Sequence, residues 1–198
     1  DIKSVLKWIN ANRTEDRVNA KKSSVNMNMP ALLIASLNHR LQLMTLLLQL
    51  GAGVDWRASQ GLTAMSLMFS KDAFEMGDVN KRIIRLLLSW GASFFPDDGC
   101  SREVSINEAR NAGAHELVNL LKSELGGRRC EIVNLLSRPE LNGSTCVADE
   151  YLPDSNQYKV TLESKSKKVL VLSPDNLKRR DRTPQDCGYY VEFKNGRT

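Results

Sequence analysis

Residues that could do nucleophilic, acid–base or metal chemistry are few and widely separated in this sequence. The 198 residues include only two histidines and four cysteines, and no C-x-x-C pair. The cysteines are Cys100, Cys130, Cys146 and Cys187. Zinc sites draw Cys and His ligands from short, paired spacings, so no metal site is expected. We expect free buried thiols rather than disulfides, and no cofactor.

The motifs of common enzyme classes are also missing. The sequence contains no G-x-x-x-x-G-K-[ST], G-x-G-x-x-G, H-E-x-x-H or G-x-S-x-G pattern. His39 and His115 fall at or beside loops between expected helices, where a structural role is favoured over that of a general base. The neighbouring Asp97 and Asp98 offer too few convergent oxygens for a cation. We therefore expect that the protein is not an enzyme.

Basic residues form the densest charged cluster of the chain. The formal net charge is +5, and one cluster lies near the end: Lys178, Arg179, Arg180 and Arg182. Such side chains can contact phosphates or an acidic partner. The simpler alternative is a solvated loop. No aromatic-rich pattern of the kind that stacks on single-stranded nucleic acid accompanies the cluster.

A helical repeat occupies the first 125 residues. Apolar residues recur at i, i+3, i+4 and i+7, the spacing of one helix face, in segments beginning at Ile2, Leu43, Ile83 and Leu117. The last of these breaks the pattern at its final position. Asn10-Ala11, Gly51-Ala52 and Gly91-Ala92 follow the first three as helix stop signals. Shorter helices are expected before the last three, at 30–36, 63–68 and 106–113.

This repeated unit resembles the ankyrin repeat. Gly61-Leu62-Thr63-Ala64-Met65 matches the start of the family pattern, residues 109–118 its middle and residues 42–55 its end. The T-P-L-H histidine of the family is replaced by Leu33, Ser66 and Asn107, and an insertion lies within 71–78. The resemblance implies about three stacked repeats with a rigid surface that recognises proteins.

Aromatic residues fall where ankyrin hairpins project. Trp56 with Arg57, and Phe94 with Phe95, occupy corresponding positions after the helix stop signals. Exposed aromatic and arginine side chains are good interface anchors, so we predict partner contacts at these four residues. The alternative is that the rings pack between repeats, in which case the insertion at 71–78 is the next candidate surface.

The hydrophobic period changes to two after Gly126-Gly127. Strands are expected at 131–136, 145–151, 158–162 and 169–172, the last as a core strand, with further alternation at 189–193. Five short strands predict a small closed barrel. Residues 127–178, with Leu141-Asn142-Gly143 and Pro174-Asp175-Asn176-Leu177, resemble an SH3-like, KOW-type barrel.

These patterns predict an α+β protein of two domains. An ankyrin-like repeat domain spans 1–125, and the five-stranded antiparallel barrel with a C-terminal extension spans 126–198. We expect a non-catalytic protein–protein interaction or scaffold module, a docking or assembly subunit of a larger complex. The alternative is an RNA- or ribosome-associated protein that binds through the basic barrel. No apolar run approaches the roughly 20 residues of a membrane span. We expect an intracellular location, in the cytoplasm or in an organelle interior. The organelle is included because a targeting segment could precede Asp1.

Overall fold

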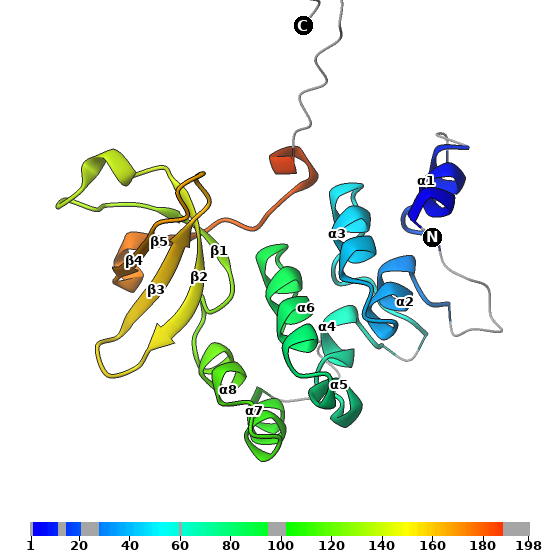
Figure 1. The fold of residues 1–198 in the computed structure, drawn as a ribbon, viewed down its shortest axis with the longest axis horizontal. Coiled ribbons are helices and arrows are strands. Elements are labelled where there is room, and N and C mark those ends of the chain that lie inside the picture. The colour runs from blue at the N-terminus through cyan, green and yellow to red at the C-terminus, as the bar shows by residue number, and fades with distance from the viewer. Residues whose placement is uncertain (1, 12–14, 21–27, 60, 95–101, 188–198) are drawn as a thin grey trace, which may run out of the picture.

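Helices form the first part of the chain and a five-stranded antiparallel sheet forms the second, so the fold is α+β (Figure 1). The computed structural model describes residues 2–11, 15–20, 28–59, 61–94 and 102–187. Its helices are α1 (Ile2–Asn10), α2 (Ala31–Leu37), α3 (Leu41–Gln49), α4 (Ala64–Leu67), α5 (Lys71–Glu75), α6 (Asp78–Ser89), α7 (Arg102–Asn111) and α8 (His115–Lys122). In this described part of the chain, no helix has the length and apolar character to cross a membrane.

The helices pair along the chain, and in two of the three pairs a short helix precedes a longer one as predicted. The pairs are α2 with α3, α4 with α6, and α7 with α8, and they lie side by side across the molecule (Figure 1). In the third, α7 begins at Arg102 rather than at 106 and, at 10 residues, is longer than α8 at 8 residues. The expected insertion forms the extra helix α5. Thr63 begins α4 with a reciprocal capping box: Ser66 N–H donates to Thr63 Oγ1, and the Ser66 hydroxyl accepts from Thr63 N–H. Gly51 and Gly91, at φ of +93° and +89°, follow α3 and α6 as the stop signals predicted.

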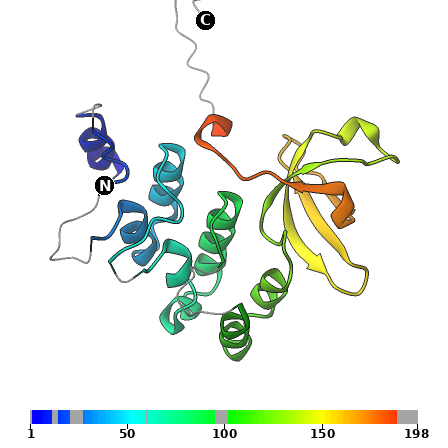
Figure 2. The same cartoon turned by 180° about the vertical axis from the view of Figure 1, so that it is seen from behind.

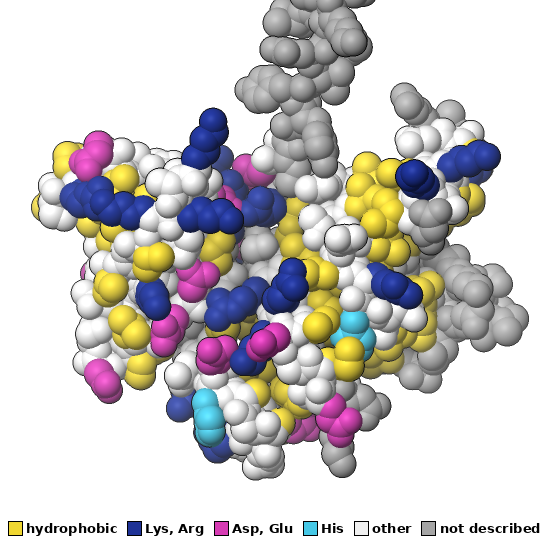
Figure 3. All heavy atoms as spheres, in the orientation of Figure 1, with side chains coloured by type: hydrophobic (Ala, Val, Ile, Leu, Met, Phe, Trp, Pro, Cys, Tyr) yellow, Lys and Arg dark blue, Asp and Glu magenta, His cyan; other side chains and the backbone are white. Residues whose placement is uncertain are grey.

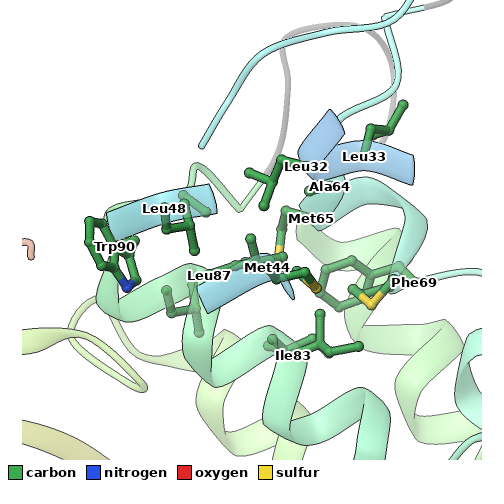
Figure 4. Close-up of a cluster of buried hydrophobic side chains, with 14 of the residues drawn as sticks. Leu32, Leu33, Met44, Leu48, Ala64, Met65, Phe69, Ile83, Leu87 and Trp90 are labelled. Carbon is green, nitrogen blue, oxygen red and sulfur yellow. The ribbon is translucent and has the colours of Figure 1, made fainter. Parts of the chain in front are cut away.

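The helical part has its own hydrophobic core. Side chains from α2, α3, α4 and α6 gather between the helices (Figure 4). Leu47, Leu87 and Ile83 are fully buried there, and Trp90 is buried as expected from its place on the apolar stripe. Burying one stripe of each helix against its neighbours stabilises the array, because no single pair could cover its own apolar face.

The sheet has the order β4-β3-β2-β1-β5, with every neighbouring pair antiparallel. Its strands are β1 (Arg129–Ile132), β2 (Thr145–Leu152), β3 (Gln157–Leu162), β4 (Val169–Leu172) and β5 (Leu177–Arg179). Alternate residues of these strands form a second core, separate from the helical one.

The predicted closed barrel is wrong, because the described sheet is open. β4 pairs only with β3, and β5 pairs only with β1. β5 is three residues long, and the chain then turns toward the helices, where the Arg182 N–H donates to the Ser89 carbonyl at 2.9 Å. Figure 2 shows this segment running from the sheet toward α3, against which the turn Pro184–Cys187 lies.

Two strand predictions also need correction, and a third cannot be judged. β1 ends at Ile132 rather than 136, because the following residues enter a loop. β4 is an edge strand rather than a core strand, and its Val169 and Val171 are half exposed. The alternation expected at 189–193 lies outside the described residues.

Candidate interaction surfaces

Successive turns of the helical part are tied by one polar side chain each. Asn19 accepts from the Gly53 N–H at 2.8 Å and donates to the Gly51 carbonyl at 3.3 Å. Asp55 accepts from the Ser93 N–H at 2.9 Å and from the Ser93 hydroxyl at 2.7 Å. Both side chains therefore bind the residue two places after a glycine that ends a helix. These hydrogen bonds hold each turn against the next one along the helical part.

Trp56 lies on the surface of one of these turns. Its side chain is 43% exposed, and its ring covers Gly53 so closely that a Cβ atom there would collide with the ring. The neighbouring Arg57 is partly buried. The structure thus keeps Trp56 accessible, and its contact with a partner stays a prediction.

Phe94 has different surroundings, although its turn touches that of Trp56 through Asp55. The Arg128 guanidinium lies 4.6 Å from the centroid of the Phe94 ring, and Phe94 packs on the helical core. Much of this ring is therefore covered from within the chain. Phe95 falls outside the described residues.

Arg128 ties the sheet to the helices. It is 3% exposed and donates to the carbonyls of Ala92 at 2.6 Å and Leu88 at 3.3 Å, at the end of α6. Burial lowers the pKa of Arg128 to about 10, so the side chain stays charged at neutral pH. It gives the Ala92 carbonyl a donor and adds a second donor to the Leu88 carbonyl, which also accepts from the Gly91 N–H at 3.1 Å. The sequence analysis missed this role, since an arginine before a strand carries no signal of its acceptors.

The basic cluster near the end of the chain is largely paired within the protein. Arg179 binds Asp181 at 2.7 Å, Arg180 binds Glu131 at 3.0 Å, and Arg182 binds Glu163. Arg179 also donates to the Gly91 carbonyl at 3.3 Å. Only Lys178 of the four predicted residues has no ion pair with another described residue. Three of the four charges are therefore partly neutralised by carboxylates of the same chain.

A groove of about 450 Å³ opens between the insertion and α7. Its apolar wall includes Phe69 and Phe74, whose rings meet edge to face with centroids 6.4 Å apart. The carboxylates of Glu75 and Glu108 come from the two facing helices. An apolar wall beside two carboxylates suits an apolar side chain flanked by a basic one. The sequence predicted the insertion, but no pattern in it predicted that α7 would lie opposite.

The described residues include no cluster of side chains arranged for catalysis. No three His, Cys, Asp or Glu side chains there are placed to hold a metal. Cys130 and Cys146 face each other across β1 and β2, fully buried. Burial raises the pKa of these thiols to about 11 and about 12. Neutral buried thiols are poor nucleophiles.

Comparison with known proteins assigns no family. No protein-family model matches the chain, and no curated protein is significantly similar to it.

Proposed function

We propose that this chain is a non-catalytic protein-recognition module that docks onto a partner within a larger assembly. The groove between α5 and α7 carries the proposal. Its aromatic wall can bury an apolar anchor, and packed helices hold it in place. Interfaces draw most of their affinity from a few such anchors in well-packed pockets.

The finer fold assignment is part of this proposal. The helix pairs form an ankyrin-type stack, supported by Asn19 and Asp55, which tie successive turns in the same way. The sheet is an SH3-like unit that stays open at β4 and β5. Such a stack supplies a rigid platform, which limits the conformational entropy lost on binding.

The chemistry of the groove defines the partner. Glu75 and Glu108 are exposed carboxylates beside Phe74. A partner segment with a large apolar residue and nearby lysine or arginine complements all three. The carboxylates favour encounter with that segment, and burial of the apolar residue stabilises the complex.

The RNA alternative has less support. Phosphate contacts need cations that are free to replace counterions. Arg179, Arg180 and Arg182 are already paired with carboxylates of the same chain. Phosphates that bind these arginines would compete with those carboxylates for the same charges.

A charge reversal in the groove tests the proposal. Full-length wild-type protein and the Glu108→Lys variant are used to capture partners from the native source, with quantitative mass spectrometry. We expect a fixed set of proteins whose recovery falls about tenfold with the variant, since a repulsive charge at a small interface costs more than 1 kcal/mol. The control is Glu103→Lys, an exposed residue of the same helix that does not line the groove. Equal recovery with both variants would contradict the groove. A captured set that nuclease treatment removes would favour the RNA alternative.

A further inference from the structure

The two edges of the sheet are built differently. β5 reads Leu-Lys-Arg, and its charged residues are exposed. Charged side chains on an edge strand are a common protection against pairing with another chain. β4 reads Val-Leu-Val-Leu and has no charge within it. It is therefore the one edge of the described sheet without this protection.

The backbone of β4 is available for a further strand. The Leu162 N–H donates to the Lys168 carbonyl at 2.9 Å, and the register pairs Val160 with Leu170. Hydrogen-bonded pairs alternate along an antiparallel ladder. Lys168, Leu170 and Leu172 thus direct their backbone groups toward β3. The N–H and C=O groups of Val169 and Val171 point away from β3, to the open edge.

Apolar side chains are exposed beside this backbone. Val169 and Val171 are 49% and 51% exposed. A groove of about 230 Å³ lies at the same edge, and its lining includes residues 170–173 and, from the loop after β1, Leu135, Ser137 and Arg138. Leu136 of that loop is 94% exposed, more than any other large hydrophobic residue in the described chain. A strand laid along β4 would cover apolar surface as well as complete hydrogen bonds.

The charge at this edge indicates what binds there. Lys165, Lys167 and Lys168 precede β4, are exposed and form no ion pair with a described residue. Figure 3 shows Lys and Arg side chains among hydrophobic ones on the side of the molecule that carries the sheet. An antiparallel strand added to β4 would place its own C-terminal end beside these lysines. Acidic residues at that end would complement them.

We propose that the β4 edge binds an extended acidic segment of a partner protein, which adds a sixth, antiparallel strand to the sheet. The segment presents alternating apolar residues to Val169 and Val171, followed by several Asp or Glu residues beside the lysines. Main-chain hydrogen bonds supply affinity, and the side chains supply specificity. This surface is separate from the groove between α5 and α7, so it holds whether or not that groove binds a partner.

A labelled peptide tests the backbone contacts. The probe has two valines at alternating positions followed by four aspartates, and its binding to the full chain is followed by fluorescence anisotropy. We expect saturable binding that N-methylation of the peptide at alternate amides weakens about tenfold or more, because each methyl removes a donor to β4. The Val171→Pro variant should weaken binding similarly, since this N–H faces the open edge. Unchanged binding of the N-methylated peptide would overturn the proposal, whatever the stability of the variant.

A charge test identifies the occupant. Reversing Lys165, Lys167 and Lys168 to Glu should weaken peptide binding about tenfold and remove most of its salt dependence. The control reverses three lysines of the helical part: Lys3, Lys7 and Lys122. Equal binding of a peptide with four lysines in place of the aspartates would contradict the acidic partner. Sedimentation showing a dimer that Val171→Pro abolishes would replace the partner by a second copy of this chain.

Discussion

Glu163 lies at the centre of an ion-pair network that ties the sheet to the segment after it. Arg129 Nε lies 2.6 Å from its carboxylate, Arg182 binds it, and Arg129 also binds Asp186 at 3.3 Å. Burial by itself would raise the pKa of Glu163. The hydrogen bond from Arg129 and the charge of Arg182 outweigh it, so the pKa lies below the ordinary 4.5.

The lowered pKa of Glu163 makes stability depend on pH. A carboxyl whose pKa is lower in the folded state contributes stability above its unfolded pKa, and that contribution is lost as pH falls through the folded pKa. Glu163→Gln should reduce the free energy of unfolding at pH 7 by about 2 kcal/mol, since Arg129 keeps a buried charge with one partner fewer. Between pH 6 and pH 3 the variant should lose less stability than wild type, as measured by urea unfolding. The exposed Glu140→Gln serves as control, and an equal pH dependence in all three proteins would contradict the network.

The two buried cysteines give a second prediction at this scale. Cys130 and Cys146 are opposite each other inside the sheet, and burial holds their thiols neutral. In a chain whose Cys100 and Cys187 are replaced by Ser, an aromatic disulfide reagent at pH 8 should react only as fast as the protein unfolds. Denaturant should release both thiols at once. A rapid reaction of the native protein would show that the sheet opens readily.

At the scale of the element, the turns depend on Asp55. Its carboxylate accepts from both the backbone N–H and the hydroxyl of Ser93. Asp55→Ala should lower the free energy of unfolding by about 1–2 kcal/mol, because hydrogen bonds to a charged group are lost. Asp55→Asn keeps an acceptor and should lose about half as much. Thermal melting measures the stability of both variants. An alanine variant as stable as wild type would contradict a role for the hydrogen bonds between Asp55 and Ser93.

The helices could be predicted because their signals are local. The stripe around Leu47 and the capping residue Thr63 act within one turn of the helix they define. The edge strand β5 was not predicted, because two of its three residues are charged and show no alternation. The chain leaves the open sheet after β5 and forms a hydrogen bond from Arg182 to Ser89, and no pattern within either segment predicts that contact.

Candidate surfaces were less predictable than elements, since each combines distant residues. Trp56 could be named from its place after a helix stop, and the structure leaves it on the surface. Phe94 occupies the equivalent place, but a residue 34 positions later covers it. The groove at Phe74 and Glu108 needs α7 to pack beside the insertion. The hydrophobic period and the composition of a segment describe one face of one helix or strand. They cannot predict which helices and strands pack against each other.

For the whole molecule, the question is whether the helices and the sheet unfold together. The two hydrophobic cores are separate, and the domain boundary near Gly126 stays a prediction. Contacts nevertheless cross it: Arg128 binds the Leu88 and Ala92 carbonyls, and Arg85 donates to the Asp149 carbonyl at 2.8 Å. Arg128 is the most buried of these groups, so the coupling should depend chiefly on it.

Aromatic residues allow the two parts to be followed separately. All three tryptophans, Trp8, Trp56 and Trp90, precede residue 126, and all four tyrosines follow it. In urea, tryptophan fluorescence and tyrosine absorbance of wild type should change at one midpoint. Arg128→Met removes the donor to the buried Ala92 carbonyl and one of two donors to the Leu88 carbonyl, and should cost about 1–3 kcal/mol. It should also separate the two midpoints, since each core then unfolds with less support from the other. Arg138→Met, on the exposed loop, should leave them coincident. Two separate midpoints already in wild type would instead favour helical and sheet parts that fold independently. A single unchanged midpoint in Arg128→Met would show that the coupling between the two parts comes from Arg85 and the segment after β5.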